Sequence, residues 1–188
     1  WMDEGFTSFA SAEIMNYLRT KKLIPGDVSE DPLKRSIEGY LRFSKSGIEQ
    51  PMNTHSDHFK ANQAYGASAY TKGAVCLTQL EYIMGKRTFR SALLKYFETW
   101  KFKRPNANDF FRIMEKESGL ELHWFKEYFI NTTDVPDYAI GEVEDMPDGK
   151  TSITLYKLQQ MPMPQEVTVT FTDGTSHLYY IPIRIMRG

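Results

Sequence analysis

The sequence predicts an α+β protein in which a mainly helical segment precedes an antiparallel β-sandwich segment. Up to about residue 134, apolar residues recur three or four positions apart, which is the period of a helix. After Pro136 the period becomes two, and apolar residues alternate with threonines in the run from Val167 to Thr172. We therefore expect two domains: a helical one at residues 1–135 and a β-sandwich-like one at residues 136–188 that need not be complete.

Two predicted helices come before a long irregular stretch. Residues 6–20 have apolar or small side chains on nearly every side, which is typical of a buried helix. Pro25-Gly26 ends this unit, and Asp31-Pro32 opens a second, shorter helix. From Lys45 to Gly66 the periodicity disappears. A structureless stretch of about 20 residues is uncommon in a compact domain and often lines a site.

Apolar stripes predict four more helices, each bounded by a cap or a glycine. They are residues 69–84, stopped by Gly85; residues 87–100; a helix capped by Asn106 or Asn108 and closed by Gly119; and a last helix with Leu122, Phe125 and Phe129. The period of two then begins, and it marks the change from helices to strands.

Two tight turns are predicted in the β segment. Asp173-Gly174 lies between two alternating runs and predicts a hairpin with a type I′ turn. This hairpin should pair Val167–Thr172 with Ser176–Ile181, and the return strand should run on from Leu178 to Ile185. Asp148-Gly149 predicts the second turn.

Composition excludes several classes of function. The 188 residues carry a formal net charge of −1, so the chain has no electrostatic footprint for nucleic acid or anionic lipid. Hydrophobic residues make up 41%, which is enough for a packed core. No apolar run approaches the roughly 18 residues that a membrane span needs. Cys76 is the single cysteine, so no internal disulfide can form, and its apolar neighbours indicate a small buried residue.

The four histidines do not predict a metal site of their own. His55 and His58 lie three apart in the irregular stretch, whereas His123 and His177 are isolated. A zinc site needs three or four converging ligands, and the sequence contains neither His-Glu-x-x-His nor Cys-x-x-Cys. We therefore interpret the histidines as solvated or hydrogen-bonded side chains.

Two segments resemble one known family. Trp1-Met-Asp-Glu4-Gly-Phe6 resembles the Trp-Leu-Asn/Asp-Glu-Gly-Phe element of the zinc aminopeptidases related to aminopeptidase N, which are gluzincin metallopeptidases. Tyr70-Thr-Lys-Gly73 resembles the Tyr-x-Lys-Gly element of the same family, at a similar separation. Later segments, through Tyr138, also resemble the family. The resemblance implies the C-terminal half of a thermolysin-like catalytic domain, followed by a small β domain.

The resemblance implies roles for three residues. Glu4 would be the third zinc ligand, after two histidines of a His-Glu-x-x-His helix about twenty residues upstream. Tyr70 would donate a hydrogen bond to the tetrahedral intermediate, and Tyr65 would line the substrate site. The side chains of Glu4 and Tyr70 should then approach one point. Without the resemblance, Glu4 would be interpreted as a charge at a helix start and Tyr70 as a half-buried packing residue.

The chain differs from the family pattern at two points, and Lys72 gives a separate expectation. Many members have a second glutamate seven residues beyond the ligand, where this chain has Ser11; Glu13 lies on the opposite side of the helix. Lys72 is expected to pair with a carboxylate at the surface. The His-Glu-x-x-His helix, and the Gly-rich strand that anchors the amino terminus of the peptide, are not in this sequence.

Two functions remain open. The first is a fragment of a zinc aminopeptidase that removes N-terminal residues from peptides, with peptide substrates and the rest of the parent polypeptide as partners. A start at Trp1, inside a helix-start motif, favours it. Because two ligands and the general base are missing, we expect this chain alone to be inactive and to bind zinc only weakly. The second is a non-catalytic helical and β interaction module that keeps the family scaffold. No feature of the sequence indicates a compartment.

Overall fold

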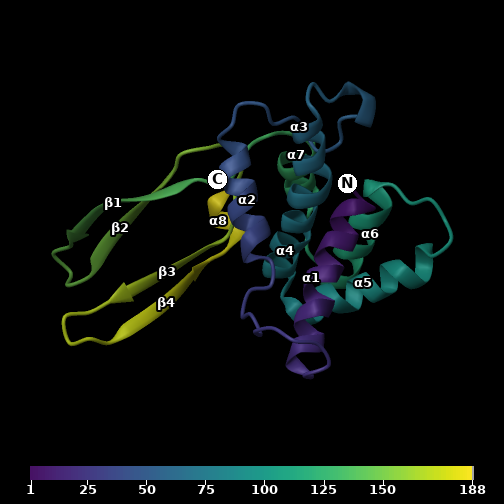
Figure 1. Ribbon diagram of the computed structural model, residues 1–188. Helices are drawn as coiled ribbons and strands as arrows, with labels where there is room; N and C mark the ends of the chain where they lie inside the picture. Colours follow the sequence, from purple (N-terminus) through teal and green to yellow (C-terminus); the bar gives the residue numbers. More distant parts are fainter. Residues whose placement is uncertain (188) are drawn as a thin grey trace. The chain divides into compact units, whose positions relative to one another are not determined.

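The structure, a computed structural model, describes residues 1–187 (Figure 1). It divides into two compact units, Trp1–Thr133 and the residues from Asp134 onward. The first unit is helical, and every strand of the described chain lies in the second. The predicted α+β class, with helices followed by antiparallel strands, is therefore confirmed. No helix among the described residues is long and apolar enough to cross a membrane.

The first unit is built from seven α-helices and two short non-α turns. They are α1 (Glu4–Thr20), α2 (Lys34–Ser44), the 3₁₀ turn η1 (Ser56–His58), α3 (Asn62–Gly66), the π-turn η2 (Ala67–Lys72), α4 (Gly73–Met84), α5 (Lys86–Trp100), α6 (Ala107–Ser118) and α7 (His123–Asn131). The stretch at residues 45–66 is therefore not wholly structureless, because η1 and α3 lie within it. The predicted helix at residues 69–84 starts earlier, since α3, η2 and α4 follow one another without a break.

Aromatic and aliphatic side chains from most of these helices form the core. Phe110 packs with its ring centroid 5.0 Å from that of Phe6 and 5.1 Å from that of Tyr96. The predicted apolar stripe of α7 is buried as well, and Phe125 stacks on Phe129 at 5.1 Å. Cys76 is fully buried, as its apolar neighbours predict, and burial raises the pKa of its thiol.

Helix α6 begins and ends where the sequence predicts. The Asn106 side chain accepts hydrogen bonds from the backbone N–H groups of Asn108 and Asp109, and the Asp109 carboxylate accepts one from the N–H of Asn106. This reciprocal arrangement is a capping box, which satisfies N–H groups that have no partner inside the helix. Gly119 ends the helix in the left-handed conformation, with φ +70°.

The prediction that the first helix is buried on all sides was wrong. In α1 only Gly5 and Phe9 are buried, whereas Ile14, Met15 and Tyr17 are exposed. The neighbouring helices cover one side of α1, and its apolar residues on the other side have no cover among the described residues. Of these three residues, Ile14 lines a groove described below.

The second unit contains two separate two-stranded antiparallel sheets, β1–β2 and β3–β4. The strands are β1 (Tyr138–Asp145), β2 (Thr151–Lys157), β3 (Gln165–Thr170) and β4 (Ser176–Ile181). An apolar groove of about 730 Å³ lies between the sheets and is lined by residues of all four strands. Val167 pairs with Tyr179 and Thr170 with Ser176, so the predicted pairing of this hairpin is confirmed.

The predicted turn type and strand end were wrong. The Gly174 N–H donates to the carbonyl of Phe171, and the Phe171 N–H donates to the carbonyl of Thr175, which leaves a three-residue loop. Only Gly174 in this loop has a positive φ, +86°, whereas a type I′ turn needs two such residues. The return strand stops at Ile181 because Pro182 has no N–H to donate, and a short helix, α8 (Ile183–Met186), follows.

Candidate active site

Helices α1 and α4 cross with their backbones in direct contact. A Cβ atom added to Gly5 would lie 2.7 Å from the Cα of Gly73, and one added to Gly73 would lie 2.8 Å from the Cα of Gly5. No side chain fits at this separation, so both positions require glycine. Because Glu4 precedes Gly5 and the π-turn η2 precedes Gly73, the crossing brings Glu4 next to that turn.

The structure brings Glu4 and Tyr70 together. The interaction of the Tyr70 hydroxyl with the Glu4 carboxylate is the main cause that raises the pKa of Tyr70; burial and the nearby negative charge add to it. Tyr70 remains 43% exposed and Glu4 is half-buried. A carboxylate that can ligate a metal and a phenol that can donate a hydrogen bond therefore meet at an accessible point.

Tyr65 lies near Tyr70 because of the π-turn. The two tyrosines are five positions apart, and in a regular α-helix their directions would differ by about 140°. A π-turn has i→i+5 hydrogen bonds, which bring residues five apart nearly into line. Tyr65 is close enough to contribute to the raised pKa of Tyr70. Its ring packs edge-on against Phe59 at 5.7 Å and is 38% exposed.

The expectation for Lys72 was half wrong. Lys72 pairs with a carboxylate, as expected, but the pair is not at the surface. The side chain of Lys72 is fully buried, and that of its partner Glu49 is only 4% exposed. The Lys72 Nζ donates to Glu49 Oε1 at 2.8 Å and to the carbonyl oxygen of Thr132 at 3.1 Å. The Tyr40 hydroxyl donates to the same Glu49 oxygen at 3.2 Å.

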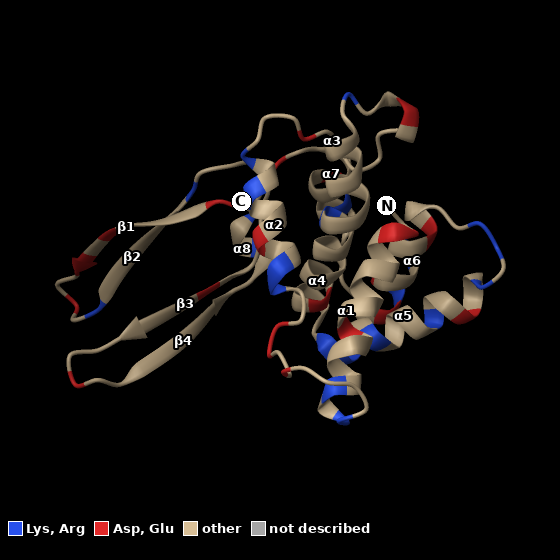
Figure 2. Cartoon of the chain, in the orientation of Figure 1, with Lys and Arg blue, Asp and Glu red and all other residues tan. Residues whose placement is uncertain are grey.

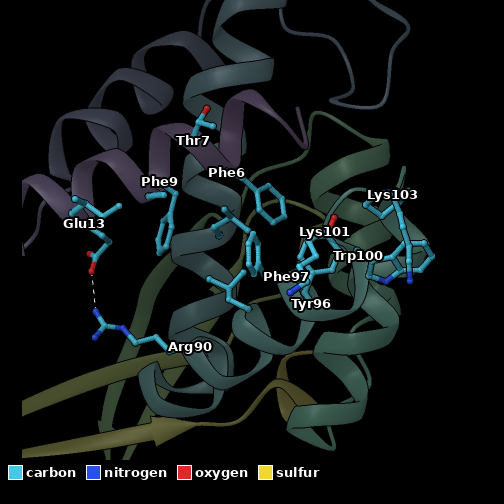
Figure 3. A pocket seen from close by; sticks show the side chains of 15 residues that line it. Phe6, Thr7, Phe9, Glu13, Arg90, Tyr96, Phe97, Trp100, Lys101 and Lys103 are labelled. Carbon is cyan, nitrogen blue, oxygen red and sulfur yellow. Dashed lines mark hydrogen bonds and ion pairs between the residues drawn. The ribbon is translucent and has the colours of Figure 1, made fainter.

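By helical spacing Ser11 lies on the same side of α1 as Glu4, and Glu13 lies on the opposite side. Ser11 is exposed. The Glu13 carboxylate accepts a hydrogen bond from Arg90 of α5 at 2.9 Å (Figure 3). No hydrogen bond among the described residues joins Ser11 or Glu13 to the Glu4 carboxylate, and the side chain that interacts with it is that of Tyr70.

The described chain supplies one candidate zinc ligand at this point. No group of three or more His, Cys, Asp or Glu side chains among residues 1–187 is arranged to hold a metal. The rings of His55 and His58 are 5.4 Å apart, but they lie on η1 and its N-cap, and nothing brings a third ligand to them. Glu4 fits a zinc site as a half-buried carboxylate, and such a site needs further ligands from elsewhere.

A large apolar groove lies on another part of the first unit. It measures about 730 Å³ and runs between α1 and α5. Figure 3 shows Phe6, Phe9, Tyr96 and Phe97 directed into the space between these helices, with Trp100 at one end. Its rim carries Arg90, Lys101 and Lys103 but only one acidic residue, Glu13. Elsewhere on the first unit acidic and basic residues are interspersed (Figure 2).

Two features of the site were missed from the sequence. The Gly5–Gly73 contact joins residues far apart in the chain, although both glycines belong to the motifs that were recognised. The burial of Lys72 depends on Glu49, which lies in the stretch without periodicity. A lysine between small and apolar residues, as in Tyr70-Thr-Lys-Gly-Ala-Val75, was the one available signal.

Known proteins resemble both the sequence and the fold. Rice aminopeptidase M1-A (Oryza sativa subsp. japonica) is 26% identical over 152 residues, which cover 80% of this chain and 16% of the rice protein. The crystal structure of Legionella pneumophila aminopeptidase A in complex with aspartic acid superimposes with a TM-score of 0.63 at 20% identity, over 95% of this chain and 20% of that one.

A second solved structure supports the same fold. It is an M1 zinc metallopeptidase mutant from Deinococcus radiodurans bound to a Tyr-Ser-Ala substrate, with a TM-score of 0.52 and 20% identity over 73% of this chain and 28% of that one. The chain spans only 13 to 18% of the length of the curated relatives it matches. Residues 1–129 match the Peptidase family M1 domain, more than half of the chain. The chain therefore belongs to peptidase family M1.

Proposed function

We propose that this chain is part of a zinc-dependent aminopeptidase that hydrolyses N-terminal residues from peptides. The observation that carries the proposal is the meeting of Glu4 and Tyr70 at the crossing of α1 and η2. The names of the relatives and of the solved structures support it, since they are aminopeptidases and a zinc metallopeptidase. Residues 1–135 would belong to the catalytic domain, and residues 136–188 to a β domain.

The residues of this chain would perform two tasks in that reaction. The Glu4 carboxylate would hold zinc, together with ligands from another part of a longer polypeptide. Zinc, when bound, supplies a Lewis acid and lowers the pKa of water to about 7. The Tyr70 hydroxyl would donate its proton in a hydrogen bond to the oxyanion that forms at the scissile carbonyl. Tyr65, beside it, would contact the peptide.

The test compares single substitutions in the longer protein. Tyr70→Phe should lower kcat about 10²- to 10³-fold with zinc content unchanged, because it deletes an oxyanion donor and no ligand. Glu4→Gln should lose zinc, and Tyr65→Phe should mainly raise KM. Tyr17→Phe, a change at an exposed tyrosine of α1, is the control and should leave all three quantities unchanged. Full activity of Tyr70→Phe, or full zinc content of Glu4→Gln, would refute the assignment.

The 188-residue chain alone should bind zinc only weakly and should hydrolyse no peptide, because Glu4 is one ligand where three are needed. Elemental analysis after dialysis against a weak chelator measures this. A His55→Ala/His58→Ala variant should be measured in parallel, to exclude zinc held at the surface by that pair. Stoichiometric zinc in both forms would contradict the proposal.

The rival function, a non-catalytic interaction module, draws its support from the apolar groove between α1 and α5. We propose instead that another segment of the same longer polypeptide covers this groove. The relatives are about four to five times as long as this chain, so they contain ample polypeptide for the purpose. The basic rim favours a segment with acidic residues beside its apolar ones.

A further inference from the structure

The buried cluster around Lys72 has no part in the reaction proposed above. Lys72 is the last residue of the π-turn η2, and its ammonium group is bonded to Glu49 and to the carbonyl oxygen of Thr132. The same group lies 5.6 Å from the ring centroid of Tyr40 and 5.5 Å from that of Phe129. One side chain therefore joins η2 to three other parts of the first unit.

Stability is a weak explanation for this cluster. Taking a lysine and a glutamate out of water costs several kcal/mol per ion, and apolar residues of similar volume often give equal or greater stability. The second carboxylate oxygen of Glu49, Oε2, is buried and has no hydrogen-bond partner among the described residues, which adds to the cost. Unlike an apolar contact, the ion pair fixes the direction of the Lys72 side chain, because its hydrogen bonds have defined geometry.

The direction that it fixes is that of Tyr70. Lys72 and Tyr70 are two positions apart in the same turn, so their side chains leave the helix on nearly opposite sides. Lys72 points into the core and Tyr70 points outward to Glu4. A π-turn is a rare conformation, and it lies within a longer α-helical run that could take up the regular form. When Lys72 is held in the core, the rotation of η2 about its helix axis is fixed, and with it the direction of the Tyr70 side chain.

We propose that Lys72, through its ion pair with Glu49, is a positioning residue that holds the π-turn so that the Tyr70 hydroxyl points at the reacting centre. The proposal rests on the function proposed above for Tyr70. It predicts that loss of the pair displaces the hydroxyl without removing it. A displacement of about 1 Å at a reacting group can cost on the order of 10²-fold in rate.

The experiment is a double-mutant cycle in the longer, zinc-loaded protein with Lys72→Met and Tyr70→Phe. Lys72→Met alone should lower kcat about 10- to 100-fold and leave KM and zinc content nearly unchanged. When Tyr70 is already phenylalanine, Lys72→Met should lower kcat no further, because there is no hydroxyl left to position. An equal loss in both backgrounds would show that Lys72 acts independently of Tyr70 and would overturn the proposal.

Two further variants separate positioning from folding. Lys72→Met leaves Glu49 buried without its partner and can unfold the protein, so Lys72→Met/Glu49→Gln, which leaves no buried charge, is measured as well. It should fold and still show the lower kcat; normal kcat in this folded variant would refute the proposal. Met114→Ala, in the core of α6, should lower the melting temperature but not the kcat of the folded enzyme.

The cycle also distinguishes this proposal from the function on which it rests. If Tyr70→Phe has full activity, the role of Tyr70 is wrong, and the role of Lys72 is lost with it. If Tyr70→Phe is impaired and Lys72→Met is fully active, the role of Tyr70 stands and only the positioning role of Lys72 is refuted.

Discussion

Gly5 and Gly73 are the residues on which the approach of Glu4 to Tyr70 depends. A methyl group at either position would meet backbone atoms less than 3 Å away, and backbone cannot rotate aside as a flexible side chain can. The helices would have to separate. The cost is then comparable to that of overpacking a core, about 1–3 kcal/mol.

We therefore expect Gly5→Ala to lower the free energy of unfolding by about 1–3 kcal/mol, measured by chemical denaturation. Gly66→Ala is the matched control, since Gly66 is also helical and has no atom within 4 Å of the added Cβ. Because alanine is the better helix former, the control should be neutral or slightly stabilising, by up to about 1 kcal/mol. Equal effects of the two substitutions would argue against the tight crossing.

Glu81 of α4 gives a prediction on pH. Burial raises the pKa of its carboxyl group above the ordinary value of 4.5, and the negative charge of Glu13 adds to this, while Lys86 and Arg90 oppose it. As the pH rises through 4.5, the unfolded chain loses this proton before the folded one does. The contribution of Glu81 to stability is therefore largest below pH 4.5 and decreases as the pH rises to the folded pKa.

Glu81→Gln removes the ionisable group and should raise the melting temperature at pH 7. The gain should vanish near pH 4, where the glutamate is protonated in both states. Thermal unfolding at the two pH values measures this. Glu98→Gln, at an exposed glutamate of α5, should show no such dependence. A gain of the same size at both pH values would rule out the explanation by ionisation.

For single residues, the sequence motifs identified the candidate site residues, but they were a poorer guide to where the side chains lie. Glu4 and Tyr70 were found because each lies in a short motif. Lys72 lies in the same motif, but a lysine is almost never fully buried unless it is paired, and the glutamate that pairs with it follows no pattern. The Lys72 side chain was therefore predicted at the surface, although the structure buries it.

Among the helices and strands, α6 has the clearest boundary signal and so provides a test of that signal. Asn106→Ala removes both hydrogen bonds that the Asn106 side chain accepts from the first turn of α6. We therefore expect a loss of about 1 kcal/mol in the free energy of unfolding. Asn106→Ser keeps a side-chain acceptor and should lie close to the wild type. Chemical denaturation of the three proteins would contradict this if alanine and serine had the same effect.

Helix boundaries were predictable from the sequence, but two finer features of the elements were not. Asp-Gly occurs both in type I′ turns and in three-residue loops that end with a left-handed glycine, so the dipeptide at Asp173 predicted the hairpin but not its loop. The π-turn η2 has no known signature in the sequence, since its residues also suit an α-helix. It is set by contacts that form only in the folded chain.

For the whole molecule, the groove between α1 and α5 is the main difference between the predicted and the observed surface. Apolar residues at helical spacing predicted buried stripes, yet Phe97 is 64% exposed and Ile14 is 56% exposed. The periodicity was correct, but a sequence pattern shows only that a face is apolar, and what covers the face must be known separately. In the proposal above, the cover is another segment of the longer polypeptide.

Phe97→Glu tests whether another segment of the longer polypeptide covers the groove between α1 and α5. In the 188-residue chain the substitution should change the melting temperature little, because the added charge stays exposed to solvent there. In the longer protein it should lower the melting temperature, because the same charge would then be buried. Leu23→Glu, which is 69% exposed and outside the groove, should leave the melting temperature unchanged. An unchanged melting temperature for Phe97→Glu in the longer protein would show that the groove is uncovered there.

The π-turn also gives the run from Asn62 to Met84 one residue more than a regular helix between the same ends would contain. Deleting Ala67 would therefore cost no hydrogen bond of the helix and no contact of the core. The two tyrosines would then be four positions apart in a regular α-helix, where their directions differ by only about 40°. The spacing of the two tyrosines and the form of the helix are therefore coupled, because a spacing of five places both on one side only in the π form, whereas a spacing of four would do so in the α form.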